Sequence, residues 1–264
     1  MLPTLFVSHG APTFAVEPGM AGPQLAALGK RFGNDLPQPR AVLVISPHWQ
    51  STTVQVTAAA HPETIHDFGG FPPALYELQY PAAGAPEMAD AVIAELQAHG
   101  IVAHANPTRG LDHGVWVPLL YLFPHANIPV VQLSLPRYAE PQDYIAFGRA
   151  IAALRARDVL VIGSGSLTHN LYEIYPGDDV AQRWATSFAH WMRDHIAIHD
   201  LEALANYRQR APDAQRAHPT DEHLMPLYVA LGAAGDDWTR SRHIDGGISY
   251  GTLSMDAYIF GAIT

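Results

Sequence analysis

The chain has 264 residues, of which 48% are hydrophobic and only 15% charged, and this composition excludes an intrinsically disordered protein. Its 15 Lys and Arg against 25 Asp and Glu give a formal net charge of −10, and the basic residues form no cluster. Nucleic acid and anionic membrane surfaces are therefore poor partners. No stretch approaches the roughly 18 apolar residues that a membrane span needs.

The sequence contains no cysteine, which excludes disulfides, thiolate metal ligands and a cysteine nucleophile. The N-terminus has no basic leader, and its apolar stretch is too short for a signal peptide, so we expect a cytoplasmic protein. No low-complexity linker divides the chain, which predicts a single catalytic domain over residues 1–264.

Short runs rich in Val, Ile and Leu alternate with amphipathic stretches, which predicts an α/β fold with a mostly parallel or mixed central sheet flanked by helices. The predicted strands span residues 2–7, 41–45, 128–135, 159–162 and 251–259. The predicted helices span residues 24–31, 87–99, 116–122, 141–155, 180–199 and 221–231. Residues 67–73 (DFGGFPP) are rich in Gly and Pro, and we expect them to form an irregular wall or lid.

Three predicted strands lead into segments that carry a histidine. His9 follows the first in SHG, His48 follows the second in SPHW, and His169 follows the fourth in GSGSLTHN. Ligands of open α/β sheets bind outside the carboxyl ends of the strands, so we expect these imidazoles to meet at one edge. The Gly/Ser turn before His169 is not followed by the Lys of a phosphate-binding loop. Its residues also do not follow the G-x-S-x-G order of a serine nucleophile motif.

Two more histidines have an informative setting among the 15 in the chain. His113 lies in the turn GLDHG, and His223 lies in HPTDEHLMPL, where we expect the first turn of a helix. His218 and Glu222 are alternative ligands in the same segment. We expect the remaining histidines to be surface or packing residues, with His66 undecided beside the wall. We also expect packing roles for Arg109, Tyr76, Tyr250 and Arg242, which are the candidates for recognising a substrate.

Seven segments resemble, in this order, the DODA-type branch of the class III extradiol ring-cleavage dioxygenases, in the superfamily of the LigB-type protocatechuate enzymes. They are LFVSHGAP, VISPHW, TIHDFGGFPPALYELQYPAAG, GLDHGVWVPL, IPVVQLSL, GSGSLTHNL and HPTDEHLMPL. The resemblance spans nearly the whole chain and implies cleavage of a catechol-type, DOPA-like substrate with O2.

The resemblance also implies roles for individual residues. The metal ligands would be His9, His48 and His223, His169 would be the acid/base, and His113 would lie near substrate and oxygen. The protocatechuate branch uses a carboxylate as third ligand, which leaves Glu222 open beside His223. Fe(II) is the expected metal for catalysis, and Zn(II) is expected in a purified or resting form, with His169 as a fourth ligand.

Two alternatives remain at this point. A zinc hydrolase would use a metal-bound water, with His169 or Glu222 handling protons. A non-catalytic module of the same fold would bind a metal and a partner only. The presence of all five histidines argues against the non-catalytic module, and the composition leaves the zinc hydrolase open. The sequence does not indicate the natural catechol or the oligomeric state.

Overall fold

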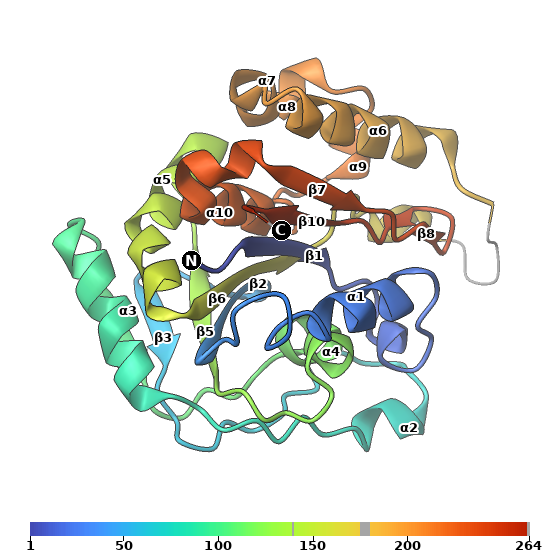
Figure 1. Ribbon diagram of the computed structural model, residues 1–264. Coiled ribbons are helices and arrows are strands. Elements are labelled where there is room, and N and C mark those ends of the chain that lie inside the picture. The colour runs from blue at the N-terminus through green and yellow to red at the C-terminus, as the bar shows by residue number, and fades with distance from the viewer. Residues whose placement is uncertain (139, 175–179, 263–264) are drawn as a thin grey trace.

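The computed structural model describes residues 1–138, 140–174 and 180–262, and within them a mixed sheet of eight strands forms the centre (Figure 1). Its strand order is β4-β3-β5-β2-β6-β1-β10-β7. The strands are β1 (Thr4–Ser8), β2 (Ala41–Ser51), β3 (Val54–Thr57), β4 (Ala103–Asn106), β5 (Val130–Pro136), β6 (Val159–Gly165), β7 (Ser241–Ile244) and β10 (Ala257–Phe260). The prediction of an α/β fold around a mixed sheet is confirmed.

The four central strands β5, β2, β6 and β1 run parallel, and β10 pairs antiparallel with β1. Because the parallel strands are buried on both faces, they are the uninterrupted apolar runs that the sequence displays. The parallel arrangement brings the carboxyl ends of β1, β2 and β6 to one edge. This edge carries the loops after β1 and β6.

Helices cover both faces of the sheet (Figure 1). Phe6 of β1 contributes to the core shared with α3, α5, α6 and α10, whereas its neighbours Leu5 and Val7 contribute to the core shared with α1 and α4. This alternation is the two-residue period of a strand. The helices are α1 (Ala21–Gly29), α2 (Pro73–Tyr76), α3 (Pro86–Ala98), α4 (His113–Leu122), α5 (Pro141–Ala150), α6 (Arg183–Ala197), α7 (Leu201–Ala205), α8 (Tyr207–Arg210), α9 (Ala214–Ala217) and α10 (Met225–Ala234).

Three strands of the eight-stranded sheet, β3, β4 and β7, were missed by the sequence analysis because they are short and lie toward its edges. β4 reads AHAN and β7 reads SRHI, so neither shows an apolar run. The predicted helix at 221–231 begins later than expected, at Met225. The predicted helix at 141–155 ends at Ala150 and continues as a 3-10 helix, Ala152–Arg157.

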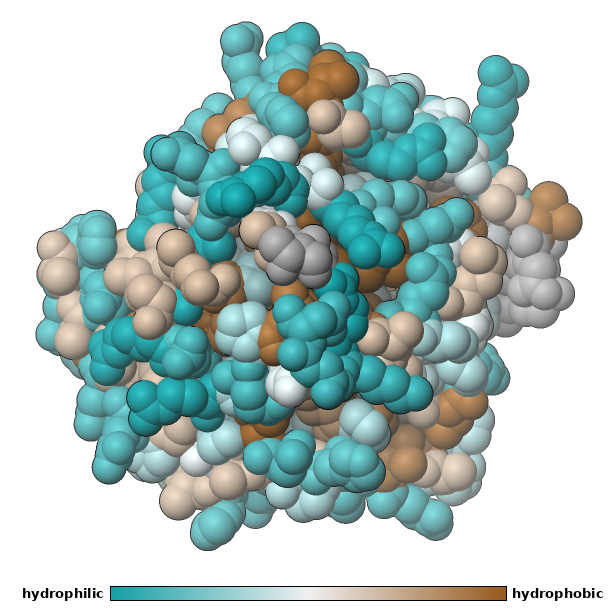
Figure 2. All heavy atoms as spheres, viewed as in Figure 1, coloured by the Kyte–Doolittle hydropathy of each residue, from teal (hydrophilic) through white to brown (hydrophobic). Residues whose placement is uncertain are grey.

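The surface in Figure 2 mixes hydrophilic and hydrophobic residues over the face shown. Among the residues that the structure describes, no helix has the length and apolar character required to cross a membrane. The cytoplasmic location stays a prediction.

Candidate active site

Two different features of the backbone bring His9 and His48 to the edge of the sheet where the parallel strands end. His9 directly follows β1, and the chain turns at Gly10, whose φ is +64°. His48 lies within β2, although the sequence suggested that the strand ends before it. The pairing of β2 with β5 shifts between Ser46 and Gln50, and this bulge contains His48. A bulge redirects side chains without ending the strand.

The other histidines lie at the ends of helices or in loops at the same edge. His113 is the first residue of α4, and His223 lies two residues before α10, not within the first helical turn as expected. His169 follows β6 after a short irregular segment. The five imidazoles therefore come from five separate parts of the chain.

The ring nitrogens of three histidines converge on one point. His48 Nε2 lies 3.2 Å from His9 Nε2 and 3.4 Å from His223 Nε2. One ligand atom from each of the three lies within 4.8 Å of the other two. Nitrogens bound at about 2.1 Å to one tetrahedral or octahedral ion are themselves roughly 3 Å apart. The donor set and its spacing fit a single divalent metal ion.

Each converging imidazole has an oxygen partner on its other nitrogen. His9 Nδ1 hydrogen bonds to Ser164 Oγ at 3.1 Å, and His223 Nδ1 hydrogen bonds to Glu222 Oε1 at 3.0 Å. His48 Nδ1 lies 3.3 Å from Asp67 Oδ2. Oxygen acceptors on Nδ1 favour the tautomer that carries hydrogen there and leaves the Nε2 lone pair for a metal.

Two side chains considered as alternative ligands face elsewhere. Glu222 contacts the outer nitrogen of His223, where it orients the ring. His218 is fully buried, packs against Phe188 and hydrogen bonds through Nε2 to the carbonyl of Leu167 at 2.9 Å. This geometry favours His223 over both alternatives.

His113 lies beside the three converging rings. Its ring centroid is 4.0 Å from that of His48 and 5.4 Å from that of His9. Its backbone N–H and its Nδ1 both hydrogen bond to Asp67 Oδ1, at 2.9 and 3.0 Å. The aromatic ring of Phe68 meets the imidazole edge-on, with centroids 5.6 Å apart. Nε2 is therefore the ring nitrogen of His113 that remains available to a ligand.

His169 stacks on His223, with ring centroids 3.5 Å apart and planes inclined by 7°. One ring nitrogen of His169 lies within 4.8 Å of ligand atoms of Glu222 and His223. The imidazole therefore lies against one of the three converging rings. This position suits either proton transfer or a fourth metal ligand.

Burial disfavours the charged form of His9, His48, His169 and His223 and so keeps these four imidazoles neutral at physiological pH. Burial, with the neighbouring imidazoles adding to its effect, holds the pKa of His9 and of His223 well below the ordinary value. Burial lowers the pKa of His48 to about 3 and that of His169 to about 4. Neutral imidazoles are the form that binds metal ions and accepts protons.

A buried carboxylate supports the segments that carry His48 and His113. Asp112 is 0% exposed and accepts hydrogen bonds from Ser46 Oγ at 2.9 Å and from Gln132 Nε2. Arg109 contacts this carboxylate at 3.3 Å, donates to the carbonyl of His48 at 3.4 Å, and stacks over Trp49. The structure thus gives Arg109 a structural role, as expected. The sequence analysis did not single out Asp112.

The predicted wall at residues 67–73 lies against this site. Phe68 packs on Tyr76 of α2 and on Trp116 of α4, with centroids 5.1 and 6.3 Å apart, as well as on His113. His66, which was undecided, packs on Trp116 and hydrogen bonds to the carbonyl of Leu78. Aromatic faces beside the imidazoles provide a surface on which a planar ring can stack.

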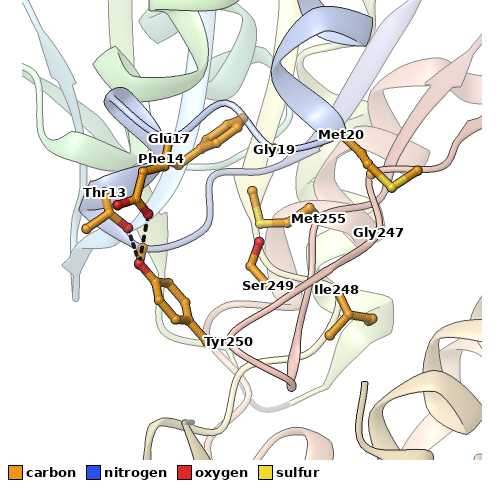
Figure 3. Close-up of a pocket in the computed structure, with 12 residues that line it drawn as sticks. Thr13, Phe14, Glu17, Gly19, Met20, Gly247, Ile248, Ser249, Tyr250 and Met255 are labelled. Atoms are coloured by element: carbon orange, nitrogen blue, oxygen red, sulfur yellow. Dashed lines mark hydrogen bonds between the residues drawn. The ribbon is translucent and has the colours of Figure 1, made fainter. Parts of the chain in front are cut away.

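A cavity of about 670 Å³ borders the loop that carries His9. It lies between a 3-10 helix, Pro12–Ala15, and the hairpin of β8 (Ile248–Ser249) and β9 (Leu253–Ser254). Figure 3 shows the hydroxyl of Tyr250 joined to Thr13 and Glu17 across the cavity. Arg242, another residue considered for substrate recognition, lies on β7, which is two strands away from β1 in the sheet.

Met255 separates this cavity from the turn after His9. The positive φ of Gly10 favours glycine at this position, and a Cβ atom there would lie 2.7 Å from Met255 Cε, the flexible end of that side chain.

Comparison with known proteins relates the whole chain to one family. The family model described as the catalytic LigB subunit of aromatic ring-opening dioxygenase matches residues 3–261. A 4,5-DOPA dioxygenase extradiol from Beta vulgaris is 38% identical over 259 residues, which cover 97% of this chain and 96% of that protein. The protein of the same name from Escherichia coli K12 is 36% identical, over 96% of this chain and 93% of its own.

A solved structure supports the same relationship. The crystal structure of an uncharacterized protein from Escherichia coli K12 superposes with a TM-score of 0.78 and is 29% identical. The match covers 99% of this chain and 100% of that one. The similarity thus extends over the complete sheet and both helical layers.

Proposed function

The chain belongs to the LigB family of aromatic ring-opening dioxygenases, and on this premise we propose that it cleaves a catechol ring in extradiol fashion with O2 at one metal ion. The proposed metal ligands are His9, His48 and His223. The observation that carries this proposal is the convergence of their Nε2 atoms, 3.2 and 3.4 Å apart, with an oxygen partner behind each ring.

Fe(II) is the proposed metal for catalysis. Imidazole suits both iron and zinc, and zinc binds such sites more tightly, so a purified or resting sample is expected to carry Zn(II). When bound, Fe(II) supplies adjacent open positions for a catechol and O2 together with the redox chemistry that zinc lacks. Three protein ligands, with His169 outside the set, leave those positions open.

His169 is the proposed acid/base. Its neutral imidazole, with a pKa lowered to about 4 by burial, can accept the proton of a catechol hydroxyl at a ring nitrogen and return it as the carbon–carbon bond beside the diol breaks. One residue can serve both steps because the proton stays on it between them.

His113 is the second proposed catalytic residue. Because its Nδ1 hydrogen bonds to Asp67, the ring has Nε2 left to hydrogen bond with a substrate hydroxyl. The phenyl ring of Phe68 lies against the same imidazole and can stack with the substrate ring. These two contacts orient the catechol, and orientation is a large part of catalysis.

The proposed substrate class is a DOPA-like catechol, because relatives over nearly the full chain carry the name 4,5-DOPA dioxygenase extradiol. The test is to load the metal-free protein anaerobically with Fe(II) or with Zn(II) and to add L-DOPA in air. We expect O2 uptake and a yellow ring-opened product with Fe(II) alone, since Zn(II) has no redox chemistry.

The same preparations test the two alternatives. Hydrolysis of ester or amide substrates by the Zn(II)-loaded protein, with no ring cleavage by the Fe(II)-loaded protein, would identify a zinc hydrolase. Full metal loading with neither reaction would leave a non-catalytic module. Either result would overturn the proposal.

A further inference from the structure

Asp67 lies on the outer side of two site histidines, His48 and His113, and contacts the Nδ1 atom of each. Its Oδ1 accepts hydrogen bonds from the backbone N–H and from Nδ1 of His113, at 2.9 and 3.0 Å. Its Oδ2 faces Nδ1 of His48 at 3.3 Å. The side chain is 20% exposed, so solvent competes weakly for these contacts. One carboxylate thus contacts three nitrogen atoms from two parts of the chain.

We propose that Asp67 is a positioning residue that holds His48 and His113 in the tautomer with hydrogen on Nδ1, so that both present Nε2 to the reaction site. This inference rests on the proposed function, because it concerns the same histidines. It gives Asp67, the first residue of the DFGGFPP segment, a role in addition to forming the wall of the site.

The need for a carboxylate follows from counting donors and acceptors. A carboxylate accepts at both oxygens, whereas the isosteric amide of Asn accepts at one and donates at the other. Oδ1 also satisfies the first N–H of α4, which has no partner within its helix. In Asp67→Asn the amide oxygen is therefore expected to remain at this position, where two donors converge.

The amide NH2 would then face Nδ1 of His48. Two N–H donors cannot point at each other, so His48 would shift its hydrogen to Nε2. That nitrogen would no longer offer a lone pair to a metal ion. Replacement of a partner that orients a metal-ligating histidine typically weakens metal binding by roughly 10- to 100-fold.

The experiment compares wild type, Asp67→Asn and Asp67→Glu as metal-free proteins with nitrogen-15 labelled histidine. Two-bond nitrogen–hydrogen correlation spectra report the tautomer of each ring, and Zn(II) affinity is measured by competition with a chromophoric chelator. In wild type we expect hydrogen on Nδ1 of His48 and His113. In the Asn variant we expect His48 to change tautomer and Zn(II) affinity to fall by roughly 10- to 100-fold.

The Glu variant keeps both acceptor oxygens and is expected to retain the wild-type tautomers and Zn(II) affinity within a few-fold. Circular dichroism verifies that each variant is folded. Asp200→Asn is the matched control, because Asp200 also accepts from a helix amide, that of Ala203, but touches no histidine of the site. It should leave spectra and affinity unchanged.

An Asn variant with wild-type tautomers and wild-type Zn(II) affinity would overturn the inference. A folded Glu variant that loses Zn(II) as the Asn variant does would also overturn it, since both acceptor oxygens would then be insufficient. Because neither measurement uses substrate or O2, these outcomes are independent of whether the Fe(II)-loaded protein opens a catechol ring.

Discussion

His223→Ala is expected to abolish stable metal binding, whereas Glu222→Ala is expected to weaken it without removing it. His223 Nε2 lies 3.4 Å from His48 Nε2 and faces the shared point, while Glu222 contacts the outer Nδ1 of His223. Loss of an orienting partner costs roughly 10- to 100-fold in affinity, and loss of the ligand itself should cost more than about 100-fold.

Metal analysis after dialysis against a weak chelator distinguishes the two variants. The exposed residue His99, whose ring hydrogen bonds to the backbone carbonyl of Glu95, provides a control substitution to Ala that should keep full metal content. Full metal content in His223→Ala together with metal loss in Glu222→Ala would move the third ligand to the carboxylate.

His169→Gln is expected to lose roughly two to four orders of magnitude in turnover, the usual scale of a general acid/base contribution. Glutamine preserves hydrogen bonding at this position but cannot carry a proton at neutral pH. Because His169 stacks on His223 and lies outside the three converging nitrogens, the variant should retain Fe(II). Substrate should still bind and change the visible spectrum of the iron site.

The rate of ring cleavage under single-turnover conditions and the iron content are measured on the same sample. Ring cleavage at the wild-type rate would remove His169 from the reaction. Loss of iron would instead make His169 chiefly a ligand, the arrangement expected for a closed four-coordinate zinc site.

The sequence predicted the edge of the sheet where the site lies because strand endings have a local signature. His9 and His169 each follow a buried apolar run, and parallel strands bring their carboxyl ends together. The local course of the chain was less predictable. His48 lies inside a strand because the register of β2 against β5 shifts around it, and such a bulge depends on the partner strand.

Asp67 and Asp112 were missed for a related reason. Both are defined by contacts with residues distant in sequence: Asp67 with His48 and His113, and Asp112 with Gln132. An isolated Asp beside Gly-rich or turn sequence is usually a loop residue. An available signal was that each acidic residue directly follows or precedes a histidine, as in IHDFGG and GLDHGV.

The most direct test of the central claim is ring cleavage with isotopically labelled O2 during titration of metal-free protein with Fe(II). If one ion bound by His9, His48 and His223 carries out the reaction, activity should rise linearly and level off at one Fe(II) per chain. Each ring-opened product molecule should contain both atoms of the labelled O2. Product that contains oxygen from water alone, or activity that is independent of Fe(II), would contradict the account.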